Sequence, residues 1–208
     1  MYTFDNQVIL ITGPAGNLGI AVAKAFRKAG GKLVLVDRHP DRLYDLFSKL
    51  VDSPDNILAT SVDVTNPRAV KEMADEVEER LGRIDVLVNT VGGYRAGKPV
   101  HEMDVDSLDY MFDLNARTVF NVSRVVIPFM LAQKSGKIIN ISAKPGLSGR
   151  KNASAYSASK SAVIRLTESM SAELKRDGIN VNCVMPSIID TPTNREYMPN
   201  ATYNRWVT

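Results

Sequence analysis

Two patterns of hydrophobic and polar positions alternate along the chain. Short runs rich in Val, Ile and Leu lie at residues 7–11, 32–36, 57–61, 85–88, 137–141 and 180–184. These runs are nearly continuous rather than alternating, which is typical of strands buried on both faces. Stretches with a helical period lie between them, at residues 18–29, 41–50, 67–81, 106–133 and 155–176. We expect the fourth of these helices to break or bend near Asn115.

Strands that alternate with helices of this length predict an α/β fold. The expected architecture is a doubly wound parallel sheet between two layers of helices, of the Rossmann type. Several helix ends are marked: Gly30 and Gly31 end the first, Asn66 and Pro67 open the third, and Gly178 ends the last. No repeat or linker divides the chain, so we expect one domain over residues 1–208.

A glycine-rich turn joins the first predicted strand to the first helix. Residues 12–19 read Thr-Gly-Pro-Ala-Gly-Asn-Leu-Gly. Glycines there let the backbone approach a pyrophosphate, and the following helix N-terminus supplies amide donors. The pattern is typical of a dinucleotide site, although such a turn alone also occurs without a ligand.

Acidic residues follow the second and third predicted strands. Asp37 lies 18 residues after Gly19, close to the ~20-residue offset at which a carboxylate meets the adenosine ribose hydroxyls. It favours NAD, while the adjacent Arg38 could pair with the 2′-phosphate of NADP. Asp63 could contact the adenine edge, or could simply cap a turn. We therefore expect NAD as cofactor, with NADP possible.

Tyr156 and Lys160 are four residues apart in a predicted helix, so both project from one face. A nearby ammonium favours the phenolate and would lower the tyrosine pKa from ~10. A tyrosine of this kind can exchange a proton near neutral pH, as general acid–base catalysis requires. An isolated pair at this spacing is common on helices and would carry no weight alone.

Composition excludes several other classes of protein. The net charge of +3 comes from 26 basic and 23 acidic residues scattered along the chain, so no nucleic-acid footprint is expected. Cys183 is the single cysteine and lies in an apolar run, which predicts a small core residue and no disulfide. His39 and His101 have no nearby ligand partner, so no metal is expected. Without a signal peptide or membrane-spanning run, the sequence predicts a cytoplasmic protein that does not enter a membrane.

Taken together, the motifs resemble the short-chain dehydrogenase/reductase family. The glycine turn, Asn89-Thr90-Val91-Gly92, Asn115, the stretch from Tyr156 to Lys160 and the stretch from Pro186 to Thr191 occur in the family's order. The resemblance covers residues 7 to about 195. It implies an NAD(P)-dependent oxidoreductase that transfers a hydride between a nicotinamide cofactor and a small alcohol or carbonyl substrate.

The resemblance also implies a role for each matching position. Tyr156 would donate the proton to the substrate oxygen, Lys160 would bind the nicotinamide ribose and depress the tyrosine pKa, and Asn115 would hold a water in the proton relay. The residues implied in cofactor binding are Gly13, Asn17, Leu18, Gly19, Asp37, Arg38, Asp63, Val64, Asn89, Gly92, Tyr156, Lys160, Pro186, Ile189 and Thr191.

One departure from the family pattern bears on catalysis. The family's catalytic serine lies 13 residues before the tyrosine, where this chain has Ala143. On a strand, the side chain of the adjacent Ser142 would point to the opposite face of the sheet. Loss of the hydroxyl should cost on the order of 10²–10³ in rate, if the serine behaves like an oxyanion donor.

Three readings of the chain with Ala143 stay open. In the first, the chain reduces a carbonyl with help from Lys144, Ser148 or substrate groups. In the second, it reduces a C=N or C=C bond, as in pterin or imine reduction. In the third, it binds the dinucleotide as a sensor or assembly subunit with little turnover. Smaller departures are Asn17 for a glycine, Thr90 and Val91 for Asn and Ala, and Ser187 for a glycine, for which we expect local effects.

The C-terminal part departs from the family in length. The family continues with another helix and a final strand, so we expect these to be missing from this sequence, with Thr208 placed as the cap of that helix. Residues 193–206 have no clear period, and the resemblance implies a mobile substrate lid there. Tyr94, Arg95 and Lys98 would border the cleft, as an anion-attracting rim or as ordinary loop residues. The resemblance also implies a homodimer or homotetramer.

Overall fold

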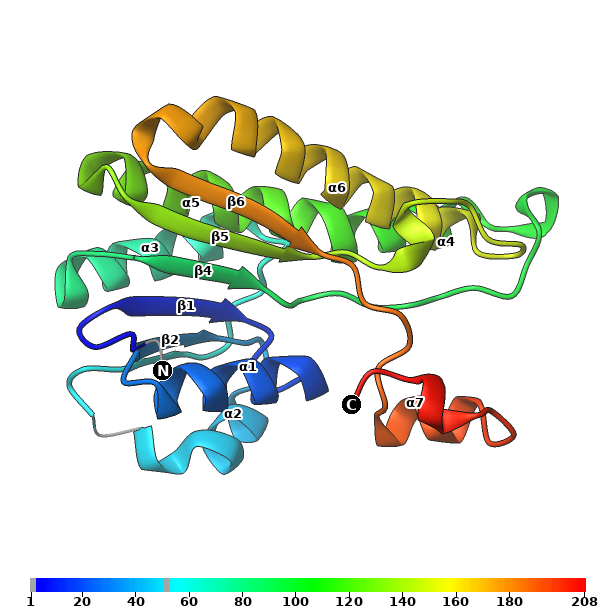
Figure 1. Ribbon diagram of the computed structural model, residues 1–208, viewed down its shortest axis with the longest axis horizontal. Coiled ribbons are helices and arrows are strands. Elements are labelled where there is room, and N and C mark those ends of the chain that lie inside the picture. Colours follow the sequence, from blue (N-terminus) through cyan, green and yellow to red (C-terminus); the bar gives the residue numbers. More distant parts are fainter. Residues whose placement is uncertain (1–2, 51–52) are drawn as a thin grey trace.

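The computed structural model describes residues 3–50 and 53–208, which form a parallel sheet covered by helices (Figure 1). The strand order is β3-β2-β1-β4-β5-β6, and every neighbouring pair is parallel. The strands are Val8–Thr12 (β1), Lys32–Val36 (β2), Ile57–Ala59 (β3), Val86–Asn89 (β4), Gly136–Ile141 (β5) and Ile179–Val184 (β6). The predicted doubly wound sheet is confirmed, and each strand lies within three residues of its predicted bounds.

Helices cover the sheet in two layers (Figure 1). One layer is formed by α1 (Asn17–Lys28) and α2 (Pro40–Phe47), beside β1 and β2. The other is formed by α3 (Pro67–Leu81), α5 (Thr118–Gln133) and α6 (Ser154–Leu174). The shorter helices are α4 (Val105–Phe112) and α7 (Pro192–Tyr197). None of the helices in residues 3–50 and 53–208 is long and apolar enough to cross a bilayer.

Strand β1 shows why its run of apolar residues is continuous. Val8 and Leu10 belong to the cluster that packs against α3, α5 and α6, whereas Ile9 and Ile11 belong to the cluster that packs against α1 and α2. Successive side chains of a strand point to opposite faces, so a strand between two helical layers needs apolar residues at every position. The four side chains are at most 1% exposed.

The predicted bend near Asn115 is a π-helical turn. Helix α4 ends at Phe112, the π turn covers Asp113–Arg117, and α5 begins at Thr118. A π turn inserts a residue into a helix and re-aims the side chains within it. Asn115 lies at its centre and is fully buried.

The segment that follows β6 contains structure that its sequence did not reveal. Helix α7 is only six residues long, and the Thr191 hydroxyl caps it by accepting from Asn194 N at 3.1 Å. Val207 then pairs with Ile189 in a parallel bridge, with Asp190 N donating to Val207 O at 2.7 Å. The chain therefore returns to the residues directly after β6.

Candidate active site

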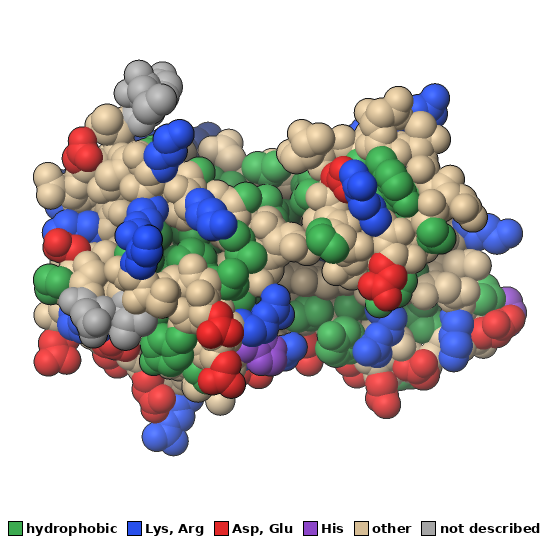
Figure 2. All heavy atoms as spheres, turned by 90° about the horizontal axis from the view of Figure 1, so that it is seen from below, with side chains coloured by type: hydrophobic (Ala, Val, Ile, Leu, Met, Phe, Trp, Pro, Cys, Tyr) green, Lys and Arg blue, Asp and Glu red, His purple; other side chains and the backbone are tan. Residues whose placement is uncertain are grey.

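The residues singled out from the sequence gather at the carboxyl edge of the sheet. The strand order reverses between β1 and β4, which is the switch point where open α/β sheets bind ligands. Seen from below, the surface is hollowed between the part that carries α1 and α2 and the part that carries α7, and hydrophobic side chains lie along the hollow (Figure 2).

The glycine turn after β1 is packed too closely to admit side chains. Gly13 has φ +66°, and a Cβ there would lie 3.0 Å from Val91 Cγ2. A Cβ on Gly19 would collide with the carbonyl oxygen of Gly13 and lie 2.8 Å from Pro14 Cα. Helix α1 has no side-chain cap and no acidic residue in its first turn. Its first amides are therefore suited to an anion such as a pyrophosphate.

Thr90 joins the two sides of the switch point. Its hydroxyl donates to Thr12 O at 2.5 Å, and its amide donates to the Thr12 hydroxyl at 3.2 Å. These bonds hold the end of β4 against the end of β1. Where the family pattern has asparagine, this chain thus uses the threonine hydroxyl to join the two strand ends.

Asp37 lies at the end of β2 with its carboxylate directed at the glycine turn. The side chain is 8% exposed and accepts from Ala15 N at 3.3 Å and His39 N at 3.0 Å. Arg38 is exposed, and its Nε donates to His39 Nε2 at 3.0 Å. The Asp37 carboxylate is therefore bonded to the glycine turn, whereas the Arg38 guanidinium is bonded to His39.

Arg42 is a residue that the sequence reasoning missed. It lies in the first turn of α2, and its Nη2 donates to Ala15 O at 2.9 Å. The same peptide segment is therefore held by Asp37 at its amide and by Arg42 at a carbonyl. The only available signal was the short spacing between Asp37 and Arg42, which many surface helices share.

Asp63 caps a turn, which was the alternative to a contact with the adenine. Its carboxylate is exposed and accepts from the amide of Thr65 at 2.9 Å and from the hydroxyl of Thr65 at 2.7 Å. The next residue, Val64, is buried, and its carbonyl accepts from Asn121 Nδ2 at 3.1 Å. The two residues thus lie where β3 runs into α3, anchored to α5.

Lys160 is one turn after Tyr156 in α6, as the spacing predicted, and is only 5% exposed. Its Nζ donates to Ile141 O at 3.0 Å. Burial lowers the pKa of Lys160 to about 8.

The predicted lowering of the tyrosine pKa is wrong for this structure. Burial raises the pKa of Tyr156, and the neighbouring Tyr94 raises it further, since two phenolates repel each other. The physical reason is desolvation, which disfavours the charged phenolate.

Tyr94 contacts Tyr156 directly. The two ring centroids are 4.8 Å apart with an interplanar angle of 80°, an edge-to-face arrangement. Tyr94 belongs to the loop after β4 and is 70% exposed. The sequence placed it at the border of the cleft, but gave no sign of this contact.

Asn115 connects the loop after β4 with α6. Its Nδ2 donates to Gly93 O at 3.2 Å and to the Ser159 hydroxyl at 3.0 Å, while its Oδ1 accepts from Gly93 N at 3.0 Å. A Cβ on Gly92 would lie 2.9 Å from Asn115 Oδ1 and 3.0 Å from Lys160 Nζ. The missing side chain of Gly92 thus leaves room for both polar groups.

Ser142 does not replace the hydroxyl of the family's catalytic serine, whose position is taken by Ala143. It is buried, and its Oγ donates to Lys160 O at 2.7 Å. Ala143 is 6% exposed and has extended backbone at the start of the next turn. The Ser142 hydroxyl is therefore bonded to the backbone of α6. This agrees with the expectation that the side chains of Ser142 and Ala143 point to opposite faces of the sheet.

A chain of buried amides runs across the sheet below the site. Asn89 Nδ2 donates to Asn140 Oδ1 at 2.9 Å, and Asn140 Nδ2 donates to the Thr167 hydroxyl at 2.9 Å. The Oδ1 atom of Asn89 is buried and has no hydrogen-bond partner among the residues that the structure describes. It is the orphaned acceptor of this network and lies at the end of β4.

The residues after β6 border the site from the other side. Pro186 O accepts from Lys144 N at 3.1 Å, which joins this segment to the turn after Ala143. Ile189 pairs with Val207, and Thr191 caps α7. The implied nicotinamide-pocket residues therefore belong to a single folded segment.

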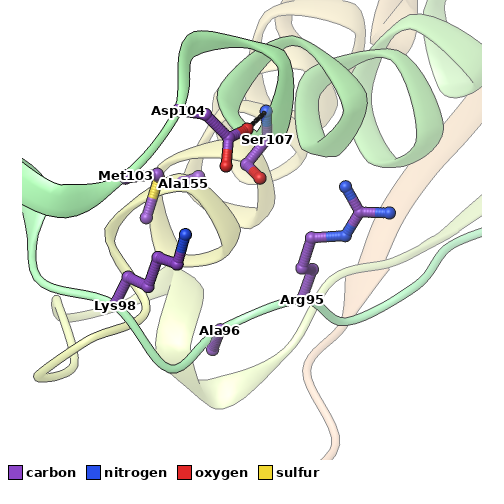
Figure 3. A pocket seen from close by; sticks show the side chains of 7 residues that line it. All are labelled: Arg95, Ala96, Lys98, Met103, Asp104, Ser107 and Ala155. Atoms are coloured by element: carbon purple, nitrogen blue, oxygen red, sulfur yellow. Dashed lines mark hydrogen bonds between the residues drawn. The ribbon is translucent and has the colours of Figure 1, made fainter.

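A surface pocket of about 290 Å³ lies beside the N-terminal end of α6 (Figure 3). It is lined by Arg95, Ala96, Lys98, Met103, Asp104, Ser107 and Ala155. Asp104 accepts from Ser107 N at 2.7 Å, so its carboxylate caps α4. Among residues 3–50 and 53–208, no group of three or more His, Cys, Asp or Glu side chains could hold a metal ion.

Comparison with known proteins places these features in a family. The sequence profile described as short chain dehydrogenase matches residues 7–202. An uncharacterised oxidoreductase of Staphylococcus saprophyticus is 34% identical over 193 residues, covering 92% of this chain and 82% of the relative. The 7α-hydroxysteroid dehydrogenase of Bacteroides fragilis is 32% identical over 194 residues, covering 92% of this chain and 75% of that enzyme.

Solved structures with the same fold contain nicotinamide dinucleotides. A gluconate 5-dehydrogenase from Burkholderia cenocepacia, in complex with NADP and tartrate, has TM-score 0.86 and 32% identity, covering 96% of this chain and 78% of that one. An NAD⁺-bound xylitol dehydrogenase has TM-score 0.86 and 29% identity, covering 96% of this chain and 79% of that one. The protein described by this fold and this site is an enzyme of the short-chain dehydrogenase/reductase family.

Proposed function

We propose that this enzyme transfers a hydride between NAD and a small alcohol or carbonyl substrate. The observation that carries the proposal is the joint position of Tyr156, Lys160 and Asn115 beside a glycine turn that excludes side chains. A protein that only bound a nucleotide would have no need of a buried lysine next to a tyrosine at the open edge of the sheet.

The residues present fit a dinucleotide. The packed turn at Gly13 and Gly19, with Asn17 and Leu18 opening α1, would hold the pyrophosphate on uncapped amides. Asp37 would accept the ribose hydroxyls. The remaining contacts would come from Arg38, Asp63, Val64, Asn89, Gly92, Lys160, Pro186, Ile189 and Thr191. When bound in reduced form, the nicotinamide supplies the hydride.

The chain's own residues would manage the proton. Tyr156 would hold its proton up to alkaline pH, since burial raises its pKa, and would give it to the substrate oxygen. Lys160, whose Nζ is held by Ile141 O, would bind the nicotinamide ribose and return a proton to Tyr156. Asn115 would orient a water in this proton relay. Residues 193–208, with α7, would close over the substrate.

The preference for NAD rests on Asp37, whose carboxylate would repel a 2′-phosphate. Solved relatives bind NAD⁺ in one case and NADP in another, so the test must include both. Calorimetric titration with NADH and NADPH should give tighter NADH binding, which weakens in Asp37→Ala. Tighter binding of NADPH would contradict the preference, and binding of neither nucleotide would contradict the oxidoreductase function.

The reaction itself is tested with a substrate panel taken from the relatives. Xylitol, gluconate and a 7α-hydroxysteroid, each with NAD⁺ and NADP⁺, sample small polyols, acids and larger ring alcohols. Turnover that is lost in Tyr156→Phe, while nucleotide binding is retained, would support the proposal. Nucleotide binding with no turnover of any compound would favour the sensor or assembly role.

Ala143 favours one further candidate, reduction of a C=N or C=C bond. Such bonds do not require the hydroxyl that polarises a carbonyl oxygen. Adding a cyclic imine and an activated alkene to the panel tests it, because these compounds should then be reduced faster than any ketone.

An oligomer is also part of the proposal. Helices α4 and α5 expose large hydrophobic side chains, among them Val105 (71%), Phe120 (53%) and Leu108 (41%). Pairing of these helices between subunits would cover them. Sedimentation equilibrium should give a dimer or tetramer, and a monomer would contradict this part.

A further inference from the structure

We infer that the Tyr94 hydroxyl is the hydrogen-bond donor to the substrate oxygen, in the role left without a hydroxyl at Ala143. The inference rests on the proposed carbonyl–alcohol function and assigns a donor to it. Two phenols would then share the reacting oxygen, with Tyr156 transferring a proton and Tyr94 donating a hydrogen bond.

The contact between the two rings carries the inference. Tyr94 meets Tyr156 edge to face at 4.8 Å between centroids, yet 70% of Tyr94 stays exposed. One side of its ring is therefore held by the proton donor, and most of the side chain is open to a substrate. Tyr94 also raises the pKa of Tyr156, in keeping with the close contact of the two rings.

The backbone on which Tyr94 stands is fixed. Both polar atoms of the preceding peptide residue, Gly93, are bonded to the buried amide of Asn115, at 3.0 Å for its N–H and 3.2 Å for its carbonyl. Asn115 is itself held by Ser159 of α6. This backbone anchor and the ring contact with Tyr156 together restrain the Tyr94 side chain before the substrate arrives. A donor positioned in advance is the condition for effective electrostatic stabilisation.

Two serine hydroxyls near Tyr156 already donate their protons to backbone carbonyls. Ser142 donates to Lys160 O at 2.7 Å, and Ser159 donates to Tyr156 O at 2.9 Å. Ala143 offers no hydroxyl at all. Tyr94 combines direct contact with the Tyr156 ring and an exposed side chain, which these serines do not.

The chemical step remains balanced with Tyr94 in this role. The substrate carbon gains a hydride from the reduced nucleotide of the proposed function, and its oxygen gains the proton of Tyr156. Tyr94 keeps its own proton, and its hydrogen bond strengthens as negative charge develops on the oxygen. No further oxidant or reductant is involved.

The first experiment removes only the hydroxyl. In Tyr94→Phe the ring contact is kept, so kcat for the best compound of the panel should fall on the order of 10²-fold, with the Kd for NADH unchanged. The matched control is Tyr110→Phe, which removes a phenol hydroxyl from α4 and should leave kcat unchanged. An unchanged kcat in Tyr94→Phe overturns the inference and leaves the proposed function standing.

The second experiment distinguishes a chemical role from a structural one. Ala143→Ser supplies a hydroxyl at the vacant position, and in the Tyr94→Phe background it should restore kcat to within about tenfold of the wild type, since either donor can serve. Failure of the serine to restore a lost kcat overturns the shared role. Wild-type protein that binds NADH but turns over no compound overturns the proposed function and the Tyr94 role with it.

Discussion

Asn89 and Asn140 hold each other across β4 and β5 through a hydrogen bond of 2.9 Å between Nδ2 of the first and Oδ1 of the second. Asn140 is completely buried, and its Nδ2 donates a second hydrogen bond to the Thr167 hydroxyl of α6. Two buried strands and a helix are thereby joined by polar groups just below the candidate active site.

Asn140→Ala should lower the free energy of unfolding by about 2–3 kcal/mol, because it leaves the amide of Asn89 buried without a partner. The matched control is Asn182→Ala on the neighbouring strand β6, where the side chain is exposed and the change should stay within about 0.5 kcal/mol. Urea denaturation measures both. Equal effects in the two variants would show that the network adds nothing to stability.

Gly19→Ala should destabilise the protein by about 1–3 kcal/mol, because the new methyl group meets the backbone of Gly13 and Pro14. The site leaves no flexible side chain that could move aside. Gly149→Ala is the control, since a Cβ there has nothing within 4 Å. Thermal unfolding, followed by circular dichroism, should show a lower Tm for Gly19→Ala and an unchanged Tm for Gly149→Ala.

Lys160 should make stability rise with pH above about pH 8. Its folded pKa of about 8 is below its ordinary value of 10.5, so the unfolded state binds more protons between these values. The ammonium therefore destabilises the fold below pH 8, by up to about 3 kcal/mol. This cost disappears as the pH rises towards 10.5.

Lys160→Met isolates this contribution. The stability of the variant relative to the wild type should be greatest near pH 7 and should decrease between pH 8 and 10.5. Urea denaturation at a series of pH values measures the difference. A difference that is constant over this range would mean that the folded pKa of Lys160 is not lowered.

Arg42→Ala should weaken NADH binding about fivefold, which corresponds to one lost hydrogen bond of about 1 kcal/mol at Ala15 O. Without that bond the Ala15 carbonyl loses the side chain that holds it, and the Ala15 segment is held by Asp37 at its amide. Arg27→Ala, at the far end of α1, removes the same charge from an exposed position. If both variants weaken binding equally in calorimetry, the effect is one of net charge.

The strands could be predicted because burial on both faces makes each of them a continuous apolar run, and the long helices because burial on one face gives them a helical period. Helix α7 could not be predicted, since six residues are too few to show a period. The bend near Asn115 was expected, but the contacts of Asn115 with Gly93 and Ser159 join residues far apart in sequence.

Side-chain environments were the least predictable part of the site. The direction of the Tyr156 pKa depends on how deeply the fold buries it and on Tyr94, 62 positions earlier in the chain. Arg42 resembles any exposed helical arginine until α2 is placed beside the glycine turn. In each case the deciding neighbour comes from another element, so no local pattern could reveal it.

The π-helical turn at Asp113–Arg117 constrains the length of the chain as well as its composition. Deleting one residue there would let α4 and α5 run on as one regular helix, but would rotate α4 by about 100° relative to α5. Met111 would then leave the core or Asn115 would leave Gly93. Single-residue deletions should therefore be selected against at this turn, while the exposed loop around Gly149 can change in length without disturbing either helix.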